Sequence, residues 1–464
     1  MGSAVNSAAI RSRLLPTAAM NETRLSLFAR LFGIALVAHV VGNWSQPDIP
    51  SPVGWVNLAV GVVGLALVTL PTRSLLVTAS ALVLASLLLE IPVTGNHWVL
   101  AGLTAAAIVT GGKGTRFFPA TRAILLVFYC FAAFAKLNHG FFDPDVSCAV
   151  FYANQSLAGV GLSPLGAGGI IPRIVIWATV AIELSVPITL IWRRSRYLGV
   201  LIGTLFHTLI SFDVNQHFYD FTSVLIALFV LFLPDRSIEL LAEQFAELKR
   251  RSVVPGKFLL GLTGVLVLLA VSPLSPLLAF LLSRGALALW VTFSALWITA
   301  LLRARAPGVA LRWNAGVGGA VIVLIAVLNG LTPYTEVKTA YSFNMYANLV
   351  TARGESNHFV FRSTLPLRTG YEGPVEILES SDAGLNAYRD EGYLVAYPQL
   401  RRYLSVRPDV QLTFRRFGEV VTLPVASASP ELVDPGPWWW RFFPLRAIDT
   451  LDPPRCQAAF LPAL

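Results

Sequence analysis

Long runs of apolar residues fill the chain from about residue 25 to residue 332. A helix needs roughly 20 consecutive apolar residues to cross a bilayer, and most of these runs approach that length. The runs lie at about 25–44, 55–71, 74–91, 97–111, 122–138, 172–192, 197–212, 217–234, 257–282, 286–302 and 313–332. They predict an α-helical polytopic membrane bundle of about 11 spans, a count that changes by one or two if a short run is tilted or re-entrant.

The pattern changes after about residue 333, where short alternating stretches are separated by Gly, Pro and Asp. These stretches are HFVFRS, GPVEILES, GYLVAYP and VQLTFRRFGEVVTLPV. Such alternation between turn residues is typical of strands. We therefore expect a cytoplasmic lead at 1–24, a transmembrane domain at 25–332 and a C-terminal exported, β-rich domain at 333–464. The stretch PGPWWWRFFPL (435–445) is expected to hold that domain against the lipid interface or the spans, because Trp favours that boundary.

Composition agrees with a membrane protein and argues against a soluble enzyme. Of the 464 residues, 55% are hydrophobic and only 13% are charged, and the mean hydropathy is +0.65. The net charge of +9 is uneven: residues 1–335 hold 22 Lys and Arg against 12 Asp and Glu, and the remainder hold 13 against 14. The basic excess therefore belongs to membrane loops, and nucleic acid is not an expected partner.

The basic loops also predict an orientation, because Lys and Arg accumulate on the cytoplasmic side. With a cytoplasmic N-terminus every second loop is basic, and only Lys136, Arg173 and Arg284 of the basic residues in the membrane part remain outside. The first 24 residues lack the short apolar core and cleavage site of a signal peptide. We expect a multi-pass protein of the plasma or inner membrane with an extracytoplasmic C-terminal domain.

Ionisable and amide side chains gather at the predicted outer level of the bundle. Lys136 ends an apolar run in FAAFAKLNHGFFDPD, and Asn138 and His139 follow it. The remaining members, on other spans and outer loops, are Asn96, His97, Glu183, His207, Asp213 and His217. Ionisable groups within a membrane are costly and indicate function by default, so their shared depth favours a site.

Each of these residues also has a structural interpretation. Lys136 can extend its amine to the lipid headgroups, and His97 and His217 can be ordinary loop residues. His207 and Glu183 can form hydrogen bonds between helices. No metal is expected, since the histidines lack a tight ligand spacing such as HxxxH or HExxH.

A family resemblance is carried by the same stretches. The run FYCFAAFAKLNHGFFDPDVSCAVFYA resembles a segment of the HTTM, or vitamin K-dependent γ-carboxylase-like, membrane protein family, in which a span ends in an aromatic-small-Lys-Leu pattern. NHW upstream and FH downstream match the family's Asn-His pair and its later span histidine. Residues 329–361 look like the family's passage from the last span into the exported domain, so the match touches most of the chain from about 25 to 360.

The resemblance implies an enzyme in which Lys136 is the base that acts on a hydroquinone, either reduced vitamin K or menaquinol. O2 then adds to the resulting anion, and the strongly basic product removes a γ-proton from a glutamate, which captures CO2 as the quinone epoxide forms. By the same match Asn96 and His97 hold the quinone oxygens or stabilise developing charge, and His207 supports them or relays a proton. The residues expected to contact the cofactor with Asn96 are Asn138, His139, Glu183, Asp213 and His217.

This interpretation predicts that Lys136, His97 and His207 converge in one mostly apolar cavity of roughly 300 Å³ or more, opening to the outer half of the bilayer. The expected partners are membrane lipid, a lipid-soluble quinone and a peptide or protein substrate. Bacterial relatives in this broad family need not carboxylate anything, so hydroquinone oxidation without carboxylation stays open.

Two other classes of function are weighed beside the enzyme. One is a non-catalytic membrane module that assists the assembly, export or immunity of a secreted peptide, with Lys136 in a structural role. The other is a transporter, which is less favoured because no paired Gly- or Pro-broken spans mark inverted repeats.

Three cysteines complete the chemistry of the sequence. Cys130 lies within a predicted span and is most simply a small packing residue. Cys148 and Cys456 both lie outside the membrane under the predicted orientation, which suggests a disulfide in an otherwise cysteine-poor chain. The alternative is two unrelated thiols, because sequence does not give the distance between them.

Overall fold

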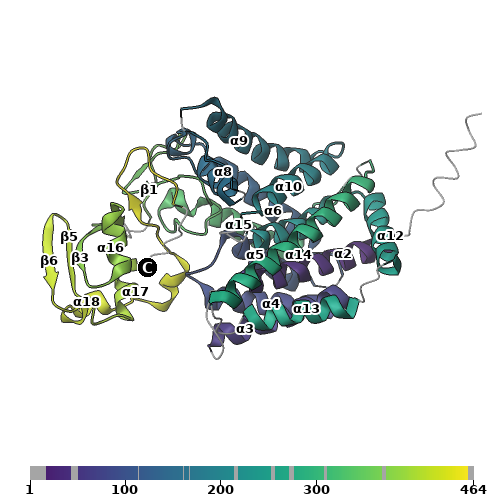
Figure 1. The fold of residues 1–464 in the computed structure, drawn as a ribbon, viewed down its shortest axis with the longest axis horizontal. Helices are drawn as coiled ribbons and strands as arrows, with labels where there is room; N and C mark the ends of the chain where they lie inside the picture. The colour runs from purple at the N-terminus through teal and green to yellow at the C-terminus, as the bar shows by residue number, and fades with distance from the viewer. Residues whose placement is uncertain are drawn as a thin grey trace, which may run out of the picture. The chain divides into compact units, whose positions relative to one another are not determined.

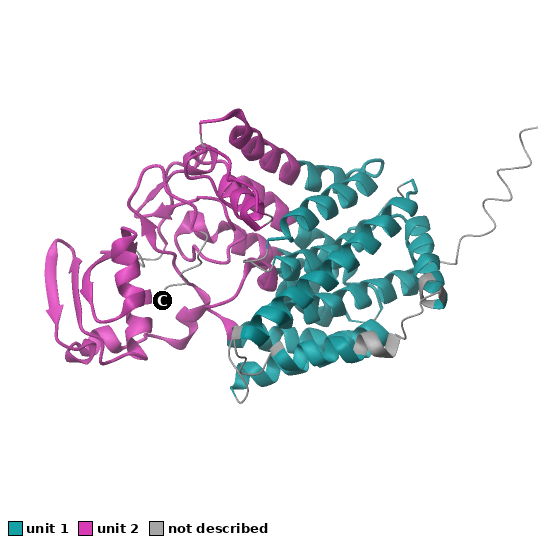
Figure 2. Cartoon of the chain, in the orientation of Figure 1, with its two compact units in different colours: residues 1–89, 100–126, 185–323 teal, residues 90–99, 127–184, 324–464 magenta. Residues whose placement is uncertain are grey.

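The computed structural model describes residues 17–42, 51–112, 114–159, 161–166, 168–213, 218–251, 256–270, 276–307, 311–367 and 373–457. The chain divides into two compact units, which Figure 2 colours separately. The first unit comprises residues 1–89, 100–126 and 185–323, and the second comprises 90–99, 127–184 and 324–464.

The first unit is helical. Its helices are α2 (Thr17–Gly42), α3 (Pro52–Thr69), α4 (Arg73–Glu90), α10 (Arg196–Ile210), α11 (Tyr219–Phe229) with the 3-10 turn η1 (Val230–Phe232), α12 (Asp235–Arg251), α13 (Gly256–Ala270) and α14 (Pro276–Arg303). The last residue of α4, Glu90, belongs to the second unit, and four more helices are divided between both units: α5 (Asn96–Thr110), α6 (Phe118–Ala135), α9 (Ile170–Ile191) and α15 (Gly316–Leu331).

Among the described residues, seven helices are long and apolar enough to cross a membrane: Ala19–Gly42, Pro52–Thr69, Arg73–Glu90, Phe118–Ala135, Ile170–Ile191, Leu277–Arg303 and Gly316–Thr335. A mostly helical chain with these helices agrees with the membrane class. The count of about 11 spans is not confirmed by the described residues, because α5 and α10 have 15 residues each and α11 has 11. At a rise of 1.5 Å per residue such helices fall short of a hydrocarbon core of about 30 Å.

The contact between α2 and α3 depends on two glycines. A Cβ on Gly33 would lie 2.5 Å from the carbonyl oxygen of Gly64, and a Cβ on Gly64 would lie 2.9 Å from that of Gly33. Any larger residue would force the two backbones apart. Small residues that allow such close approach are characteristic of packed membrane helices.

The second unit combines helical and strand segments. Its short helices are α7 (His139–Phe142), α8 (Cys148–Gly159), α16 (Ala383–Asp390), α17 (Tyr397–Ser405) and α18 (Pro430–Val433), with 3-10 turns η2 (Thr332–Thr335), η4 (Ala426–Ala428) and η5 (Trp438–Phe442). Its strands are β1 (Thr351–Ala352), β2 (Glu355–Ser356), β3 (Val375–Ser380), β4 (Tyr393–Val395), β5 (Leu412–Arg416), β6 (Glu419–Leu423) and β7 (Ile448–Asp449).

A small antiparallel sheet forms the end of the chain, with the strand order β6-β5-β3-β4-β7. Alternate residues such as Val375, Ile377 and Phe414 face a core that is completed by Leu385 of α16 and Leu400 of α17. Figure 1 shows α16 beside β3. The expected C-terminal sheet is therefore present, and three of the four predicted strand stretches supply β3, β4 and the β5–β6 hairpin.

The fourth predicted strand, HFVFRS, is wrong. Residues 358–363 form no strand and make only two isolated bridges, Asn138 with His358 and Glu355 with Ser363. The imidazole of His358 accepts hydrogen bonds from the backbone N–H groups of Val360 and Phe361, both at 3.1 Å. A side chain that takes up these donors turns the backbone away from a ladder.

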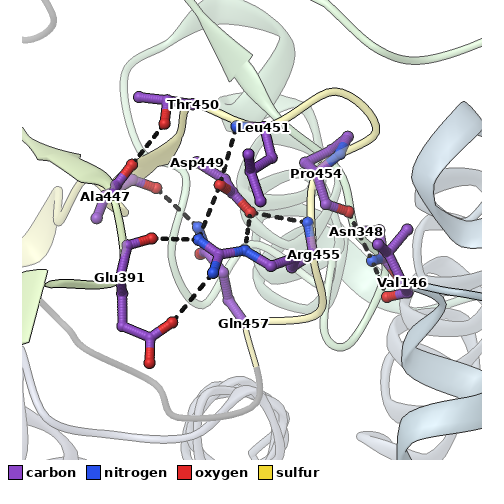
Figure 3. A network of polar contacts seen from close by, with 11 residues as sticks. Val146, Asn348, Glu391, Ala447, Asp449, Thr450, Leu451, Pro454, Arg455 and Gln457 are labelled. Carbon is purple, nitrogen blue, oxygen red and sulfur yellow. Dashed lines mark hydrogen bonds and ion pairs between the residues drawn. The ribbon is translucent and has the colours of Figure 1, made fainter.

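The suggested disulfide between Cys148 and Cys456 is present, with the two Cα atoms 4.8 Å apart. Figure 3 shows the contacts that hold the tail beside it. The side-chain amide of Asn348 donates to the carbonyl oxygens of Val146, at 2.9 Å, and Pro454, at 3.1 Å. Its Oδ1 accepts from the N–H of Cys148 at 2.8 Å, so one amide joins both ends of the disulfide.

A second anchor holds the same tail to the sheet. The guanidinium of Arg455 binds the carboxylate of Asp449 on β7, with Nε and Oδ2 3.0 Å apart, and the carboxylate of Glu391. The Asp449 carboxylate also accepts from the N–H of Arg455 at 2.8 Å. The tail is thus fixed at both the sheet and the disulfide.

Candidate functional site

Lys136 follows the last residue of α6, and only 4% of its surface is exposed. Its amine forms an ion pair with Glu183 of α9, with 2.9 Å between Nζ and Oε2. Glu183 is also buried, so both charges are withdrawn from solvent. A lysine in this position does not simply extend to the lipid headgroups, which was its structural interpretation.

Two further oxygen atoms surround the amine. Nζ donates to the carbonyl oxygens of Ala132, at 3.3 Å, and Met345, at 3.4 Å, and lies 5.8 Å from the centre of the Phe141 ring. An ammonium group has three N–H donors, and a neutral amine has two donors and a lone pair. The two carbonyl oxygens can therefore accept from either the ammonium or the neutral amine. Of the three oxygen partners, only the Glu183 carboxylate can exchange a proton with Lys136.

Asn138 is committed to the backbone. Its amide nitrogen donates to the carbonyl oxygens of Ala135, at 2.7 Å, and Ala347, at 2.5 Å. Its Oδ1 accepts from the N–H of Phe141 at 2.9 Å and caps α7. Asn138 thus shapes the turn after Lys136.

His139 lies on the exposed side of that turn. Its ring packs edge-on against Phe359 at a centroid distance of 4.7 Å, and its backbone N–H donates to the carbonyl of Asn357 at 3.3 Å. These contacts place it against the segment that follows β2.

Asn96 and His97 begin α5. The Oδ1 of Asn96 accepts from the backbone N–H of Phe343 at 2.8 Å, and Asn96 is buried. The ring of His97 covers Gly95, where a Cβ would lie 2.5 Å from it. Because Phe343 lies only two residues before Met345, one segment contacts both Asn96 and Lys136.

That segment, residues 336–348, has an unusual backbone. Five of its non-glycine residues have positive φ, between 49° and 61°: Glu336, Tyr341, Phe343, Tyr346 and Asn348. Such conformations are costly for residues with a Cβ and often lie at functional sites. The sequence pattern indicates only a passage into the exported domain and gives no sign that residues 343–345 form a wall of the site.

Two buried polar atoms beside this wall have no hydrogen-bond partner among the described residues. They are Oδ1 of Asn344, which lies between Phe343 and Met345, and Oγ1 of Thr94, two residues before Asn96. Buried polar groups are nearly always paired, so each needs an explanation. A ligand hydroxyl is a partner that suits an amide oxygen.

The remaining candidates belong to the first unit. His207 is buried in α10, with its ring 5.0 Å from those of Phe206 and Phe221. Asp213 is buried just after α10. His217 lies outside the described residues. The convergence of His207 with Lys136 and His97 stays a prediction.

A second buried lysine was not identified from the sequence. Lys338 follows η2, and its Nζ donates to Oδ1 of Asn329 on α15 at 2.6 Å. The Asn329 amide nitrogen donates to the carbonyl of Tyr341 at 3.1 Å. Burial lowers the pKa of Lys338 from 10.5 to about 7, because no described carboxylate is paired with it.

An apolar groove of about 310 Å³ lies elsewhere in the second unit. It is lined by Phe131, Phe134, Leu331, Tyr334, Phe361, Ser363, Thr364 and Leu365. Its volume falls within the predicted size. Lys136 and His97 are not among its lining residues, so this groove is not the cavity expected around them.

Comparison with protein-family models, curated proteins and solved structures finds no match for this chain. The functional conclusion therefore rests on the site itself and on the motifs in the sequence.

Proposed function

We propose that the chain is an integral membrane enzyme that oxidises a hydroquinone, reduced vitamin K or menaquinol, to its epoxide with O2. We propose further that it couples this oxidation to the carboxylation of glutamate in a peptide or protein with CO2. The observation that carries the proposal is the buried Lys136–Glu183 pair, an amine beside a proton acceptor at the end of an apolar helix. The identity of the reaction rests on the resemblance to the HTTM family.

The donors and acceptors near the pair suit a hydroquinone. Asn96 uses its Oδ1 for the backbone, which leaves its amide N–H groups for a ligand oxygen. The buried Oδ1 of Asn344 has no partner among the described residues and suits a ligand hydroxyl. Phe141 adds an aromatic surface near the amine. A hydroquinone, when bound, supplies two electrons and acidic hydroxyl protons.

The role of the pair follows from the cost of charge in an apolar site. If the Lys136 proton moves to Glu183, both groups become neutral, and the desolvation penalty of the ion pair disappears. The amine then keeps two N–H donors for the carbonyls of Ala132 and Met345, and its lone pair, which first accepts the new O–H of Glu183, takes a hydroquinone proton when that O–H turns to another acceptor. That lone pair makes Lys136 the base, with Glu183 as the acceptor that prepares it.

The proposal includes an orientation with a cytoplasmic N-terminus and an extracytoplasmic C-terminal domain. The alternating basic loops support it, and so does the Cys148–Cys456 disulfide, because such bonds persist in oxidising compartments. A reporter fused after residue 464 is expected to be active only outside the cytoplasm. Activity confined to the cytoplasm would reverse the orientation.

The enzyme is tested with purified protein, reduced vitamin K or menaquinol, and oxygen. We expect quinone epoxide with the wild type and a loss of about 100-fold or more with Lys136→Ala, the typical size of a general-base contribution. Lys338→Met is the matched control, since it removes the other buried lysine of the unit and should leave epoxide formation intact. If epoxide formation survives Lys136→Ala but disappears in Lys338→Met, the base is Lys338 and the proposal for Lys136 is wrong.

The non-catalytic module remains the second candidate, and one observation favours it. The amine of Lys136 is surrounded by a carboxylate and two carbonyl oxygens, as a purely structural lysine would be. Wild-type protein that neither binds a quinone nor forms epoxide would support the module. Carboxylation is followed separately, by incorporation of labelled CO2 into glutamate-containing peptides.

A further inference from the structure

The segment after β2 exposes apolar side chains although it lies outside the long apolar helices. Between residues 359 and 367, five large hydrophobic residues are more than one-third exposed: Phe359, Val360, Phe361, Leu365 and Leu367. The exposed fraction reaches 65% at Val360 and 66% at Leu367. A contiguous exposed apolar surface of this kind indicates a partner or a membrane. We call it the apolar loop.

The apolar loop is fixed to η2, the 3-10 turn that directly follows α15. The N–H of Leu365 donates to the carbonyl of Tyr334 at 2.9 Å, and that of Leu367 donates to the carbonyl of Thr335 at 3.0 Å. Tyr334 and Thr335 end the apolar stretch Gly316–Thr335, which is long enough to span a membrane. The loop therefore lies at the level where that helix would leave the bilayer.

His358 holds the start of the loop in one conformation. Its Nδ1 accepts two backbone N–H groups, those of Val360 and Phe361, and therefore carries no proton. Nε2 then carries the hydrogen and donates to the carbonyl of Phe134 at 2.9 Å. Burial lowers the pKa of His358, which favours this neutral form. The start of the apolar loop is thus held in one conformation and hydrogen-bonded to α6.

The 310 Å³ groove lies between this loop, α6 and the end of α15. Its walls are mainly the rings of Phe131, Phe134, Tyr334 and Phe361, with Leu331 and Leu365 beside them. The mouth is open, because half of Phe361 and 63% of Leu365 are exposed. An apolar groove with an open mouth at the bilayer level suits a hydrocarbon chain.

The groove continues the lipid-facing surface of α15. Leu324, Ile325, Leu328 and Leu331 are exposed and follow the spacing of one helix face. Leu331 belongs both to this face and to the lining of the groove. A chain in the groove is therefore in contact with the bilayer that this face would meet.

A single charge interrupts the apolar loop. Arg362 is exposed between Phe361 and Ser363 and is absent from the ion pairs formed by the described residues. An arginine at the edge of an apolar surface is well placed for a lipid phosphate, which it binds through its planar fork of donors.

We propose that the groove and the apolar loop form a docking site for a membrane phospholipid, with an acyl chain in the groove and the phosphate at Arg362. A quinone tail is the less suitable occupant. Phe131 and Phe134 line the groove, but Lys136 does not, and Lys136 donates to Ala132 on another face of the same helix end. A quinone held here would keep its ring away from the amine.

The test uses full-length protein in bilayers of phosphatidylcholine and phosphatidylglycerol with a phospholipid that carries a diazirine in its acyl chain. After irradiation, labelled positions are mapped by mass spectrometry. We expect label on 131–134, 331–334 and 359–367, and also on Ile174 and Trp177, exposed residues of α9 that report general lipid contact. Label on α9 with none at the groove would overturn the proposal.

Two tryptophan substitutions in the same loop separate the groove from its surroundings. Ser363→Trp fills the groove and is expected to lower label at Phe131 and Phe134 about five-fold or more, equivalent to roughly 1 kcal/mol. Val360→Trp, which is exposed but does not line the groove, should leave that label unchanged. Equal labelling in both variants would reject the groove as the site.

Competition identifies the occupant. Excess unlabelled phosphatidylglycerol is expected to displace the groove label, and Arg362→Gln is expected to weaken this displacement. Displacement by menaquinone with none by phosphatidylglycerol would replace the phospholipid with a quinone tail. That result would leave the epoxide assay with Lys136→Ala unaffected, so the two proposals fail independently.

Discussion

The second unit contains two lysines, and their amines have different partners: a carboxylate for Lys136 and a neutral amide for Lys338. Lys136 faces the carboxylate of Glu183 at 2.9 Å, on a helix nearly fifty residues away in the chain. Among the described residues, the amine of Lys338 has one hydrogen-bond partner, the amide oxygen of Asn329, at 2.6 Å and nine residues away in the chain. Burial lowers the pKa of Lys338 to about 7. Both amines are buried, so the difference lies in the partner.

This difference shows that depth alone does not decide what a lysine can do. Lys338 is partly neutral near pH 7, yet it has no paired carboxylate among the described residues to receive a proton. Lys136 has such a group in contact. The pair is also assembled from distant segments, whereas the contacts of Lys338 lie within residues 329–342.

The largest expected effect comes from breaking the pair. Lys136→Met leaves Glu183 buried without its partner, which should lower the free energy of unfolding by about 3–5 kcal/mol. Lys136→Met with Glu183→Leu removes both charges and should recover most of that loss. The measurement is unfolding in mixed micelles on SDS titration. A single variant as stable as the wild type would show that the pair is not formed.

Replacement of Lys338 is expected to raise the free energy of unfolding, whereas replacement of Lys136 lowers it. Its folded-state pKa, about 7, lies below its unfolded value of about 10.5, so between these pH values the unfolded state holds more protons. The free energy of unfolding should therefore rise with pH across this window. Below pH 7 the cost of burying the protonated Lys338 amine reaches its full size.

Lys338→Met removes that penalty but leaves Oδ1 of Asn329 unpaired, for a net gain of roughly 2 kcal/mol at pH 7. The pH dependence of unfolding between 7 and 10 should become flatter. A variant that is less stable than the wild type at pH 7 and keeps the same slope would contradict the lowered pKa.

The smallest expected effect is the response of the two lysine sites to reduction of the Cys148–Cys456 disulfide, which should differ between them. The Phe141 ring near Lys136 belongs to the same core as Cys148 and Cys456. Reduction of the disulfide should raise amide hydrogen exchange in residues 139–150 about ten-fold, equivalent to about 1.4 kcal/mol. Exchange in 338–342 should not change. A uniform response would show that both sites share one cooperative unit.

The sequence predicts single residues of this site better than their pairing. Lys136 and Glu183 stand out because charge is rare in an apolar run, so the sequence predicts both as site residues. Their contact was not predicted, since periodicity identifies the face of a helix but not its neighbour. Lys338 was missed because it follows the last span in a mixed stretch, VKTAY, where a lysine is unremarkable.

The backbone of the second unit shows the same limit. The alternation in HFVFRS predicts a strand, but His358 takes up the N–H groups that a strand would offer to a neighbour. Positive φ at Tyr341, Phe343 and Tyr346 has no sequence signal, because these residue types normally avoid that conformation. Surrounding tertiary contacts must hold them there, and such contacts are not visible in a local pattern.

The separation of Cys148 and Cys456 along the chain also determines when their bond can form during synthesis. Cys456 is made 308 residues after Cys148, so the loop beside Lys136 stays unlocked through most of translation and membrane insertion. A chain that stops before Cys456 carries Cys148 as an unpaired thiol. Closure of this bond therefore requires that the chain has been made through Cys456, by which point strands β3 to β7 of the sheet have all been synthesised.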